Sequence, residues 1–182
     1  MRQSTDVIRM TAEQFFQLVE SNQPTELIEG EVIVSPSPIV MHQRISRQLV
    51  ALLLRVIPNG ELFFAPMDVY FDAQNVLQPD VIWVAENSQC TIGEKYLDGP
   101  PDLLVEIFSP GTIRQDKITK FKLYERFGVR EYWLVDPIEQ YIEVYRLEDE
   151  QFLQQGIYEP GNMFESVVLN NHTILVEQIF MA

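Results

Sequence analysis

A strand, a helix and a second strand are predicted by residues 101–136, which read PDLLVEIFSPGTIRQDKITKFKLYERFGVREYWLVD. Residues 102–108 and 130–135 are dense in Val, Ile, Leu and Trp, which is typical of buried strands. Between them, Pro110-Gly111 interrupts the first strand and Gly128 ends the helix. Because a helix joins the two strands, we expect them to run parallel in one sheet.

The segments on either side of this unit extend it into an α/β (α+β) fold. Thr11 is suited to cap a short helix, and Ser37 followed by Pro38 is suited to open a longer one. The expected helices span residues 11–20 and 37–57, and the further strands span residues 27–28, 32–34, 61–65, 67–71, 80–85, 141–147 and 152–158. We therefore expect a mixed central sheet flanked by helices, with an extra N-terminal hairpin and a C-terminal hairpin.

The bulk composition is that of an ordinary globular protein. With 182 residues, 46% hydrophobic and 22% charged, the chain can bury a sizeable core, and we expect residues 1–182 to form a single domain. The longest aliphatic run, Leu49 to Leu54, is far shorter than the ~20 residues that span a bilayer, so no membrane partner is expected. The lone cysteine, Cys90, agrees with a reducing compartment. We therefore expect a cytoplasmic protein.

The net charge argues against a nucleic-acid partner, but its distribution leaves room for one. The formal charge is -14, and non-specific DNA affinity comes chiefly from cations that neutralise phosphates. Nine of the thirteen Lys and Arg residues nevertheless lie in two segments, residues 40–57 and 114–130, whereas residues 140–182 hold one cation and seven acids. A basic face on an acidic protein is compatible with this pattern.

Two charged residues fall inside the apolar stripe of the helix expected at residues 112–127. At about 100° per residue, Asp116 and Lys120 share a face with Leu123 and Phe127. Because the burial of an unpaired charge is unfavourable, an inward Asp and Lys need a reason. One reason is structural, an i,i+4 ion pair whose lysine stem covers apolar surface. The other is a functional site.

A histidine stands in a similar position on the longer helix. His42 falls at the N-terminal end of the stripe that contains Ile45, Leu49 and Leu53. A lone histidine there is more often a hydrogen-bonded packing residue than a ligand. We therefore treat His42 as a secondary candidate.

The acids Asp80 and Glu106 are expected to meet. If strands 80–85 and 102–108 pair antiparallel, the start of the first lies opposite the end of the second. This register brings Asp80 to Glu106 rather than to Asp102. Glu106 also interrupts an apolar strand, where a solvated charge is unexpected. The alternative is a glutamate at a wet sheet edge or one paired with an arginine.

Two carboxylates near a lysine suit Mg²⁺, with Mn²⁺ as a substitute. Mg²⁺ takes oxygen ligands and is commonly held by one or two carboxylates plus substrate phosphate, here Asp80 and Glu106. The cation would polarise the phosphate, and Lys120 would orient the attacking water or stabilise developing charge. Zinc suits the sequence less, because one cysteine and two histidines form no sulfur or imidazole cluster.

Several stretches are similar to a known family. They are Gln78-Pro79-Asp80-Val81, residues 101–110, Asp116 to Tyr124 and residues 128–137, together with Glu26 to Glu31 and His42. In combination they resemble the Uma-type putative restriction endonuclease family, which is abundant in cyanobacteria. The resemblance spans about residues 11–179.

The resemblance implies a restriction-endonuclease-like fold of the PD-(D/E)XK superfamily, whose sites place an Asp, a Glu and a Lys around Mg²⁺. It assigns these catalytic roles to Asp80, Glu106 and Lys120. The supporting positions are Glu31, His42 and Asp116. The superfamily lysine usually stands two residues after the Glu, where this chain has Phe108, so Lys120 on the following helix would substitute for it.

The leading hypothesis is therefore a Mg²⁺-dependent endonuclease that hydrolyses DNA phosphodiester bonds. The alternative is a catalytically inactive nuclease fold that serves as a DNA-binding or protein-interaction module, which the charge of -14 and Phe108 would favour. A hydrolase of smaller phosphate esters is a third reading. A homodimer is a further option, because a two-fold axis would supply the two sites that a duplex cutter needs.

Overall fold

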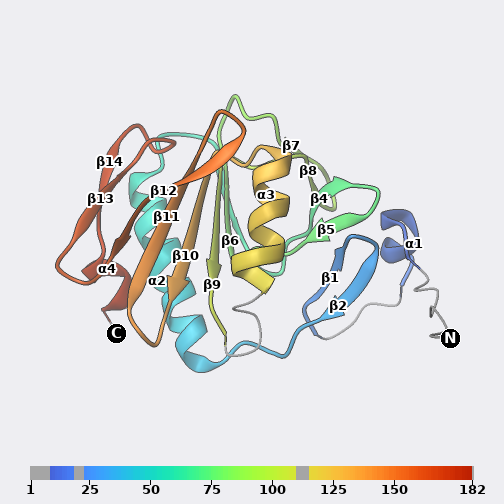
Figure 1. Ribbon diagram of the computed structural model, residues 1–182, viewed down its shortest axis with the longest axis horizontal. Coiled ribbons are helices and arrows are strands. Elements are labelled where there is room, and N and C mark those ends of the chain that lie inside the picture. Colours follow the sequence, from blue (N-terminus) through green and yellow to red (C-terminus); the bar gives the residue numbers. More distant parts are fainter. Residues whose placement is uncertain (1–8, 19–22, 110–114, 182) are drawn as a thin grey trace, which may run out of the picture.

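The computed structural model describes residues 9–18, 23–109 and 115–181, and Figure 1 shows how its elements are arranged. The helices are α1 (Ala12–Phe16), α2 (Val40–Val56), a π-helical turn (Gln115–Lys120), α3 (Phe121–Phe127) and α4 (Glu177–Phe180). The strands are β1 (Thr25–Ile28), β2 (Glu31–Val34), β3 (Glu61–Phe64), β4 (Val69–Asp72), β5 (Asn75–Leu77), β6 (Val81–Val84), β7 (Thr91–Ile92), β8 (Leu97–Asp98), β9 (Leu103–Ile107), β10 (Glu131–Asp136), β11 (Tyr141–Glu148), β12 (Gln151–Tyr158), β13 (Met163–Ser166) and β14 (His172–Leu175).

The central sheet has six strands in the order β12-β11-β10-β9-β6-β3. Strands β9 and β10 are parallel, as expected for two strands joined by a helix, and the remaining pairs are antiparallel. The sheet is therefore mixed, and the predicted strand–helix–strand unit lies at its centre. The predicted hairpin of residues 141–158 is confirmed, and it forms one edge of this sheet rather than a separate appendage.

A second six-stranded sheet was not predicted. Its order is β2-β1-β5-β4-β8-β7, and it takes in the N-terminal hairpin, which was expected as an extra element. Strands β5, β7 and β8 are only two or three residues long, too short for a hydrophobic pattern to reveal. A third, two-stranded sheet of β13 and β14 follows the central one, in the region where the sequence gives no clear pattern.

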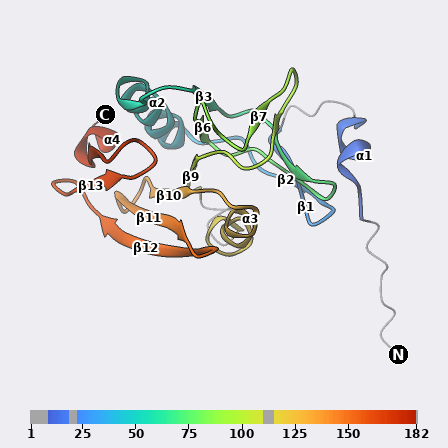
Figure 2. The same ribbon diagram turned by 90° about the horizontal axis from the view of Figure 1, so that it is seen from above.

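The two faces of the central sheet pack against different partners. Along β9, Leu103, Val105 and Ile107 point to one apolar cluster, which includes α2 and the C-terminal segment. The alternating residues Leu104 and Phe108 point to the other cluster, which includes α3 and the second sheet. This alternation is the period of two of a strand. Figure 2 shows α2 and α3 on opposite sides of the central strands.

The helix that carries Asp116 and Lys120 is not a regular α-helix along its whole length. It begins in the described residues with the π-helical turn and continues as α3, while the start expected at residue 112 lies outside the described residues. Gly128 ends it in the left-handed conformation, with φ 88°, as predicted. Wider π-turns are frequent at functional sites, and this one leaves both Asp116 and Lys120 buried.

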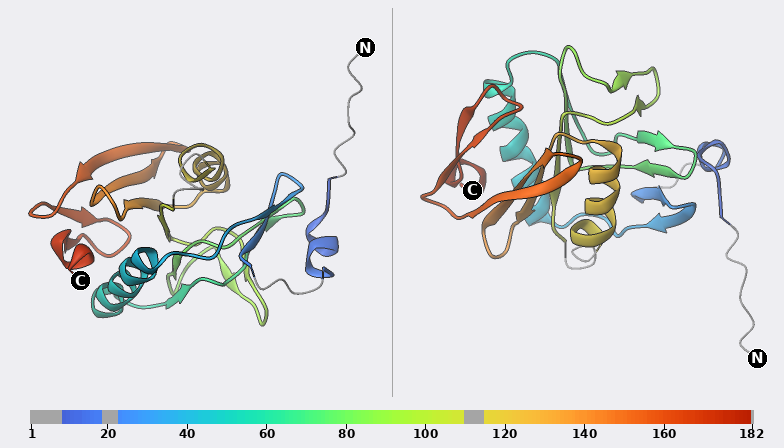
Figure 3. Two further views of the ribbon diagram at one scale, coloured as in Figure 1. Left: turned by 90° about the horizontal axis from the view of Figure 1, so that it is seen from below. Right: turned by 45° about the horizontal axis from the view of Figure 1, so that its top comes forward.

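The predicted starts of the other two helices had different outcomes. Thr11 caps α1 through reciprocal hydrogen bonds with Gln14, but α1 ends at Phe16 rather than at residue 20. The expectation that Ser37 caps α2 was wrong, since α2 begins at Val40 with Ile39 as an extended N-cap. The two prolines at 36 and 38 favour an extended chain ahead of each, and this segment reaches across from β2 to α2 (Figure 3).

Within the described residues, no helix combines the length and the apolar character needed to cross a bilayer.

Candidate functional site

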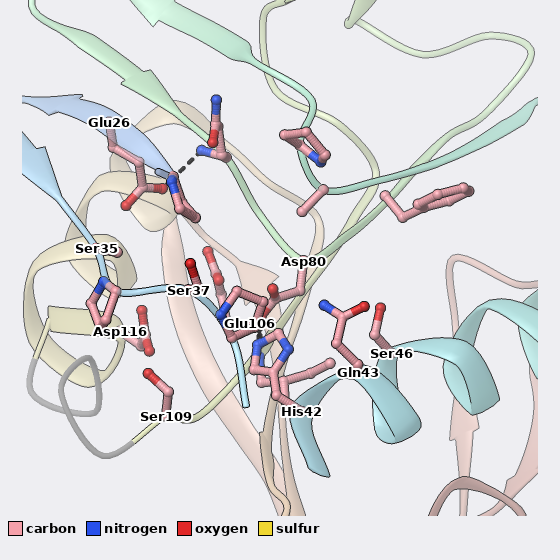
Figure 4. Close-up of a pocket in the computed structure, with 18 of the residues that line it drawn as sticks. Glu26, Ser35, Ser37, His42, Gln43, Ser46, Asp80, Glu106, Ser109 and Asp116 are labelled. Carbon is pink, nitrogen blue, oxygen red and sulfur yellow. Dashed lines mark hydrogen bonds and ion pairs between the residues drawn. The ribbon is translucent and has the colours of Figure 1, made fainter. Parts of the chain in front are cut away.

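A cavity of about 450 Å³ lies where the two large sheets approach each other. It is lined from one side by β1 and the segment before α2, and from the other by the ends of β6 and β9, the first half of α2 and the π-helical turn. Its acidic and basic lining residues are Glu26, His42, Asp80, Glu106, Asp116 and Lys120. Figure 4 shows the labelled members of this set converging from separate elements. The fold thus gathers residues that are far apart in the sequence.

The antiparallel register of β6 and β9 places Asp80 beside Glu106. Val81 pairs with Val105, so Asp80 lies next to the end of β9, and its Oδ2 accepts a hydrogen bond from the N–H of Ile107 at 2.7 Å. Asp102 lies at the other end of β9, where it binds Arg130 at 2.9 Å. The predicted register is confirmed, and it separates the two aspartates as expected.

Lys120 lies buried among the carboxylates of the cavity. Its Nζ is 2.9 Å from Glu26 Oε1, 3.0 Å from Glu106 Oε1 and 3.7 Å from Asp116 Oδ1. The side chain is only 7% exposed. The i,i+4 pair with Asp116 that the sequence offered as a structural explanation is present, but it is the longest of these three contacts. Lys120 therefore joins the helix to both sheets.

Tyr124, one turn further along the helix, makes a second contact to the same glutamate. Its hydroxyl donates a hydrogen bond to Glu106 Oε1 at 2.7 Å, and its ring is fully buried. The sequence did not single out Tyr124 as a site residue, because a helical wheel does not show what a hydroxyl reaches. Glu106 Oε1 thus accepts from both Lys120 and Tyr124.

The charges of the cavity do not balance. Burial raises the pKa of Glu106 well above its usual range, Lys120 opposes this effect, and the carboxylates of Asp116, Asp80 and Glu26 reinforce it. Burial would lower the pKa of Lys120, but the same acids, Glu106 foremost, raise it well above its usual range. Lys120 is therefore held as an ammonium ion. His42 pairs with Asp80, whereas Glu26, Glu106 and Asp116 share the one ammonium ion of Lys120, so the ionised form of Glu106 lacks enough compensating charge.

His42 contacts the cavity through Asp80. Its Nε2 is 3.1 Å from Asp80 Oδ2, and the residue is 7% exposed. Burial would lower the pKa of His42, but the hydrogen bond and charge of Asp80 outweigh it and raise the pKa. Nδ1 is buried and has no hydrogen-bond partner among the described residues. His42 is therefore both a packing residue and a neighbour of a candidate ligand.

Glu31, which the sequence analysis named as a supporting residue, does not line the cavity. Glu26, which the sequence analysis did not select, lines it instead. Glu31 is exposed on β2, opposite Ile28 at the turn end of the hairpin. Glu26 is buried on β1, where its Oε1 accepts a hydrogen bond from the N–H of Gln78 at 2.8 Å. Two residues of a strand span about 7 Å, so the register of the hairpin moves Glu31 away. The resemblance pointed to the stretch Glu26 to Glu31, but it did not show which acid of that stretch lines the cavity.

The carboxylates of the cavity do not form a closed metal cage, but they suit a hard divalent cation that uses few protein ligands. Among the described residues, no three His, Cys, Asp or Glu side chains are grouped to hold a metal ion. Mg²⁺ does not require such a group, because it commonly uses one or two carboxylates and keeps several waters. Both hydrogen bonds of the Asp80 carboxylate in the described residues go to Oδ2, and the excess of buried acids favours a cation. Asp80 and Glu106 therefore suit Mg²⁺ or Mn²⁺.

Comparisons with known proteins identify the family and the fold. A family model described as "Uma2: Putative restriction endonuclease" matches residues 12–176. An uncharacterized protein from Synechocystis sp. is 28% identical over 150 residues, which cover 79% of this chain and 85% of that protein. The crystal structure of a putative nuclease belonging to DUF820 from Anabaena variabilis matches with a TM-score of 0.78 at 23% identity, and covers 94% of this chain and 97% of that one. The structural likeness shows a shared mixed α/β fold.

Proposed function

The chain belongs to the Uma2 family, and from this membership and the geometry of the cavity we propose that it is a Mg²⁺-dependent endonuclease that hydrolyses DNA phosphodiester bonds. The observation that carries the proposal is the contact between Lys120 and Glu106 at 3.0 Å, next to Asp80 and inside one cavity. An Asp, a Glu and a Lys in one site correspond to the catalytic set of the PD-(D/E)XK superfamily. The fold would then be of the restriction-endonuclease-like kind.

Each of the three residues has a role in this proposal. Asp80 and Glu106 would hold the cation, which when bound supplies charge neutralisation at the phosphate and a more acidic water. Lys120 would place its ammonium next to the reacting phosphate and stabilise the negative charge that develops there. The hydrogen bonds from Ile107 and Tyr124 fix the two carboxylates, so the acids need little rearrangement before the reaction.

Phe108 stands where the superfamily usually has its lysine. The cavity nevertheless contains an ammonium group, that of Lys120. The ring of Phe108 is buried in the cluster that contains α3, and Lys117 Nζ lies 5.1 Å from the ring centroid. Lys117 itself pairs with Glu143 at 2.6 Å, outside the cavity. Lys120 is thus the lysine of this helix that lines the cavity, which supports its assignment as the relocated catalytic lysine.

Cleavage of supercoiled plasmid tests this proposal. We expect the protein to nick and linearise the plasmid in Mg²⁺ or Mn²⁺ and to leave it intact in EDTA, because the proposed reaction needs the cation to polarise the phosphate and to make the attacking water more acidic. The matched control is Glu31→Gln, which removes an exposed acid outside the cavity and should cut as the wild type does. If the wild type binds duplex without cutting it in either metal, the inactive DNA-binding module replaces the endonuclease as the better account.

A further inference from the structure

The outward face of α2 is a basic surface on an acidic protein. Arg44, Arg47 and Arg55 are all exposed, and residues 40–56 contain no Asp or Glu. The opposite face of α2 packs into the core through Ile45, Leu49, Leu52 and Leu53. We call the three arginines the α2 arginine face.

The cations of this face have no acidic partner. Within residues 9–18, 23–109 and 115–181, no salt bridge reaches the α2 arginine face. Of the other described cations, Arg9, Lys95 and Lys122 also lack a salt bridge but lie on three separate segments, whereas the following pair with carboxylates: Lys117, Lys120, Arg126, Arg130 and Arg146. On a chain with a formal charge of -14, three unpaired arginines on one helix form a positive surface that internal pairing does not account for.

The α2 arginine face adjoins the cavity. His42, Gln43 and Ser46 of α2 line the cavity, and Figure 4 shows all three on the helix beside Asp80. At 100° per residue, Arg47 lies only about 40° around the helix axis from Gln43. Along the axis, the distance from Arg44 to Arg55 is about 16 Å at 1.5 Å per residue. The face therefore starts at the rim of the cavity and runs away from it.

The length and the positive charge of the α2 arginine face match a stretch of the DNA phosphate backbone. Successive phosphates of one DNA strand are about 3.4 Å apart along the duplex axis, so the face spans roughly five nucleotides. Arginine is suited to such contacts, because its planar guanidinium binds phosphate oxygens in a bidentate manner. The acidic cavity repels a polyanion, so a substrate strand needs cations close by.

We propose that the α2 arginine face binds the DNA backbone next to the scissile phosphate and holds the duplex against the acidic cavity. This inference rests on the proposed endonuclease function and adds the surface that the substrate occupies. The contacts are to phosphates alone, so they give affinity and orientation without sequence preference. Binding through few phosphates is weak, and it falls as salt rises with a slope set by the number of phosphates contacted.

Fluorescence anisotropy with a labelled duplex, in EDTA so that no cleavage occurs, tests the inference. The variant Arg44→Gln/Arg47→Gln/Arg55→Gln should bind at least about tenfold more weakly at low salt, and the slope of log affinity against log salt should decrease by roughly 2 to 3. The matched control removes three exposed cations elsewhere, as Arg9→Gln/Lys95→Gln/Lys122→Gln. It should retain most of the affinity and the slope of the wild type.

Hydrolysis of bis(p-nitrophenyl) phosphate separates this inference from the proposed chemistry, because so small a diester needs no contact with α2. Loss of duplex binding with unchanged hydrolysis of the diester supports both. If the wild type hydrolyses neither substrate, but duplex binding still depends on the three arginines, the endonuclease proposal fails and the surface stands. Equal binding by wild type and α2 variant, equal losses in both triple variants, or no duplex binding at all overturns the inference.

Two further measurements keep the result interpretable. If the triple variant unfolds, the single variants Arg44→Gln and Arg47→Gln replace it, and each should lower the salt slope by about 1. Light scattering of wild type and variant detects the other occupant of an exposed helix face, a second copy of this chain. A fall in molar mass on removing the arginines would assign the face to self-association and overturn the proposed DNA contact.

Discussion

Replacement of Lys120 with methionine is expected to lower the free energy of unfolding by about 3–5 kcal/mol, the range for removing one partner of a buried ion pair. Methionine preserves the length and apolar character of the lysine stem but removes the ammonium. Glu26, Glu106 and Asp116 would then lie close together without the cation that Nζ supplies at 2.9–3.7 Å. Urea unfolding followed by tryptophan fluorescence measures the change, since Trp83 and Trp133 are both buried.

Lys122→Met is the matched control for this prediction. Lys122 lies two residues further along the same chain segment but is exposed, so its replacement should change the stability by no more than about 0.5 kcal/mol. If Lys120→Met is as stable as the wild type, the acids around Lys120 do not need its charge. The description of the cavity as a buried excess of carboxylates would then be wrong.

Replacement of Glu106 with glutamine should lower the rate of metal-dependent plasmid cleavage by at least about 10²–10³-fold, the range for losing one preorganised electrostatic contact. The amide is a far poorer ligand for Mg²⁺ than a carboxylate. It still offers an oxygen to the hydroxyl of Tyr124 and the ammonium of Lys120, which both bind Oε1 of Glu106. The fold should therefore survive the substitution.

The same substitution should leave the free energy of unfolding unchanged or raise it, because burial raises the pKa of Glu106 and makes its charge unfavourable in the folded protein. A loss of cleavage without a loss of stability separates a catalytic role from a structural one. Glu143→Gln is the matched control, since Glu143 is a buried acid that pairs with a lysine outside the cavity. It should retain cleavage, and full cleavage by Glu106→Gln would remove Glu106 from the proposed site.

The central part of the fold could be predicted because its strands are long and apolar. Residues 102–108 and 130–135 give continuous buried runs, and a single helix between them leaves one common arrangement, which the structure has. The second sheet could not be predicted in the same way. Its strands β5, β7 and β8 are held by pairing with distant neighbours rather than by a pattern of their own.

The candidate site also has a part that could be predicted from the sequence and a part that could not. The meeting of Asp80 and Glu106 follows from antiparallel pairing alone, and the inward direction of Lys120 follows from the helical period. Glu26 could not be chosen over Glu31, because that choice depends on how the hairpin docks against the central sheet. The periodicity of the sequence thus shows which face of a helix or strand a residue lies on. It does not show how two sheets pack together, because that packing depends on the tertiary structure.

The excess of buried acids connects the fold to the proposed function. If these residues served stability alone, we would expect each carboxylate to have its own cationic partner or an apolar side chain to stand in its place. Buried ion pairs seldom stabilise a fold more than apolar packing does. Here four acids line the cavity, and three of them lie within 4 Å of Lys120. A divalent cation would relieve this unfavourable charge, so the residues that lower the stability of the fold would also favour metal binding.

Isothermal titration of the protein with Mg²⁺, compared with the variant Asp80→Asn, tests most directly whether the cavity holds a divalent cation. We expect one saturable site per chain in the wild type, lost in the variant because the amide cannot replace the carboxylate as a ligand. The variant should remain folded, since its side-chain oxygen can still accept the hydrogen bond from Ile107. The absence of a saturable site in the wild type, or identical binding by both proteins, would contradict the account.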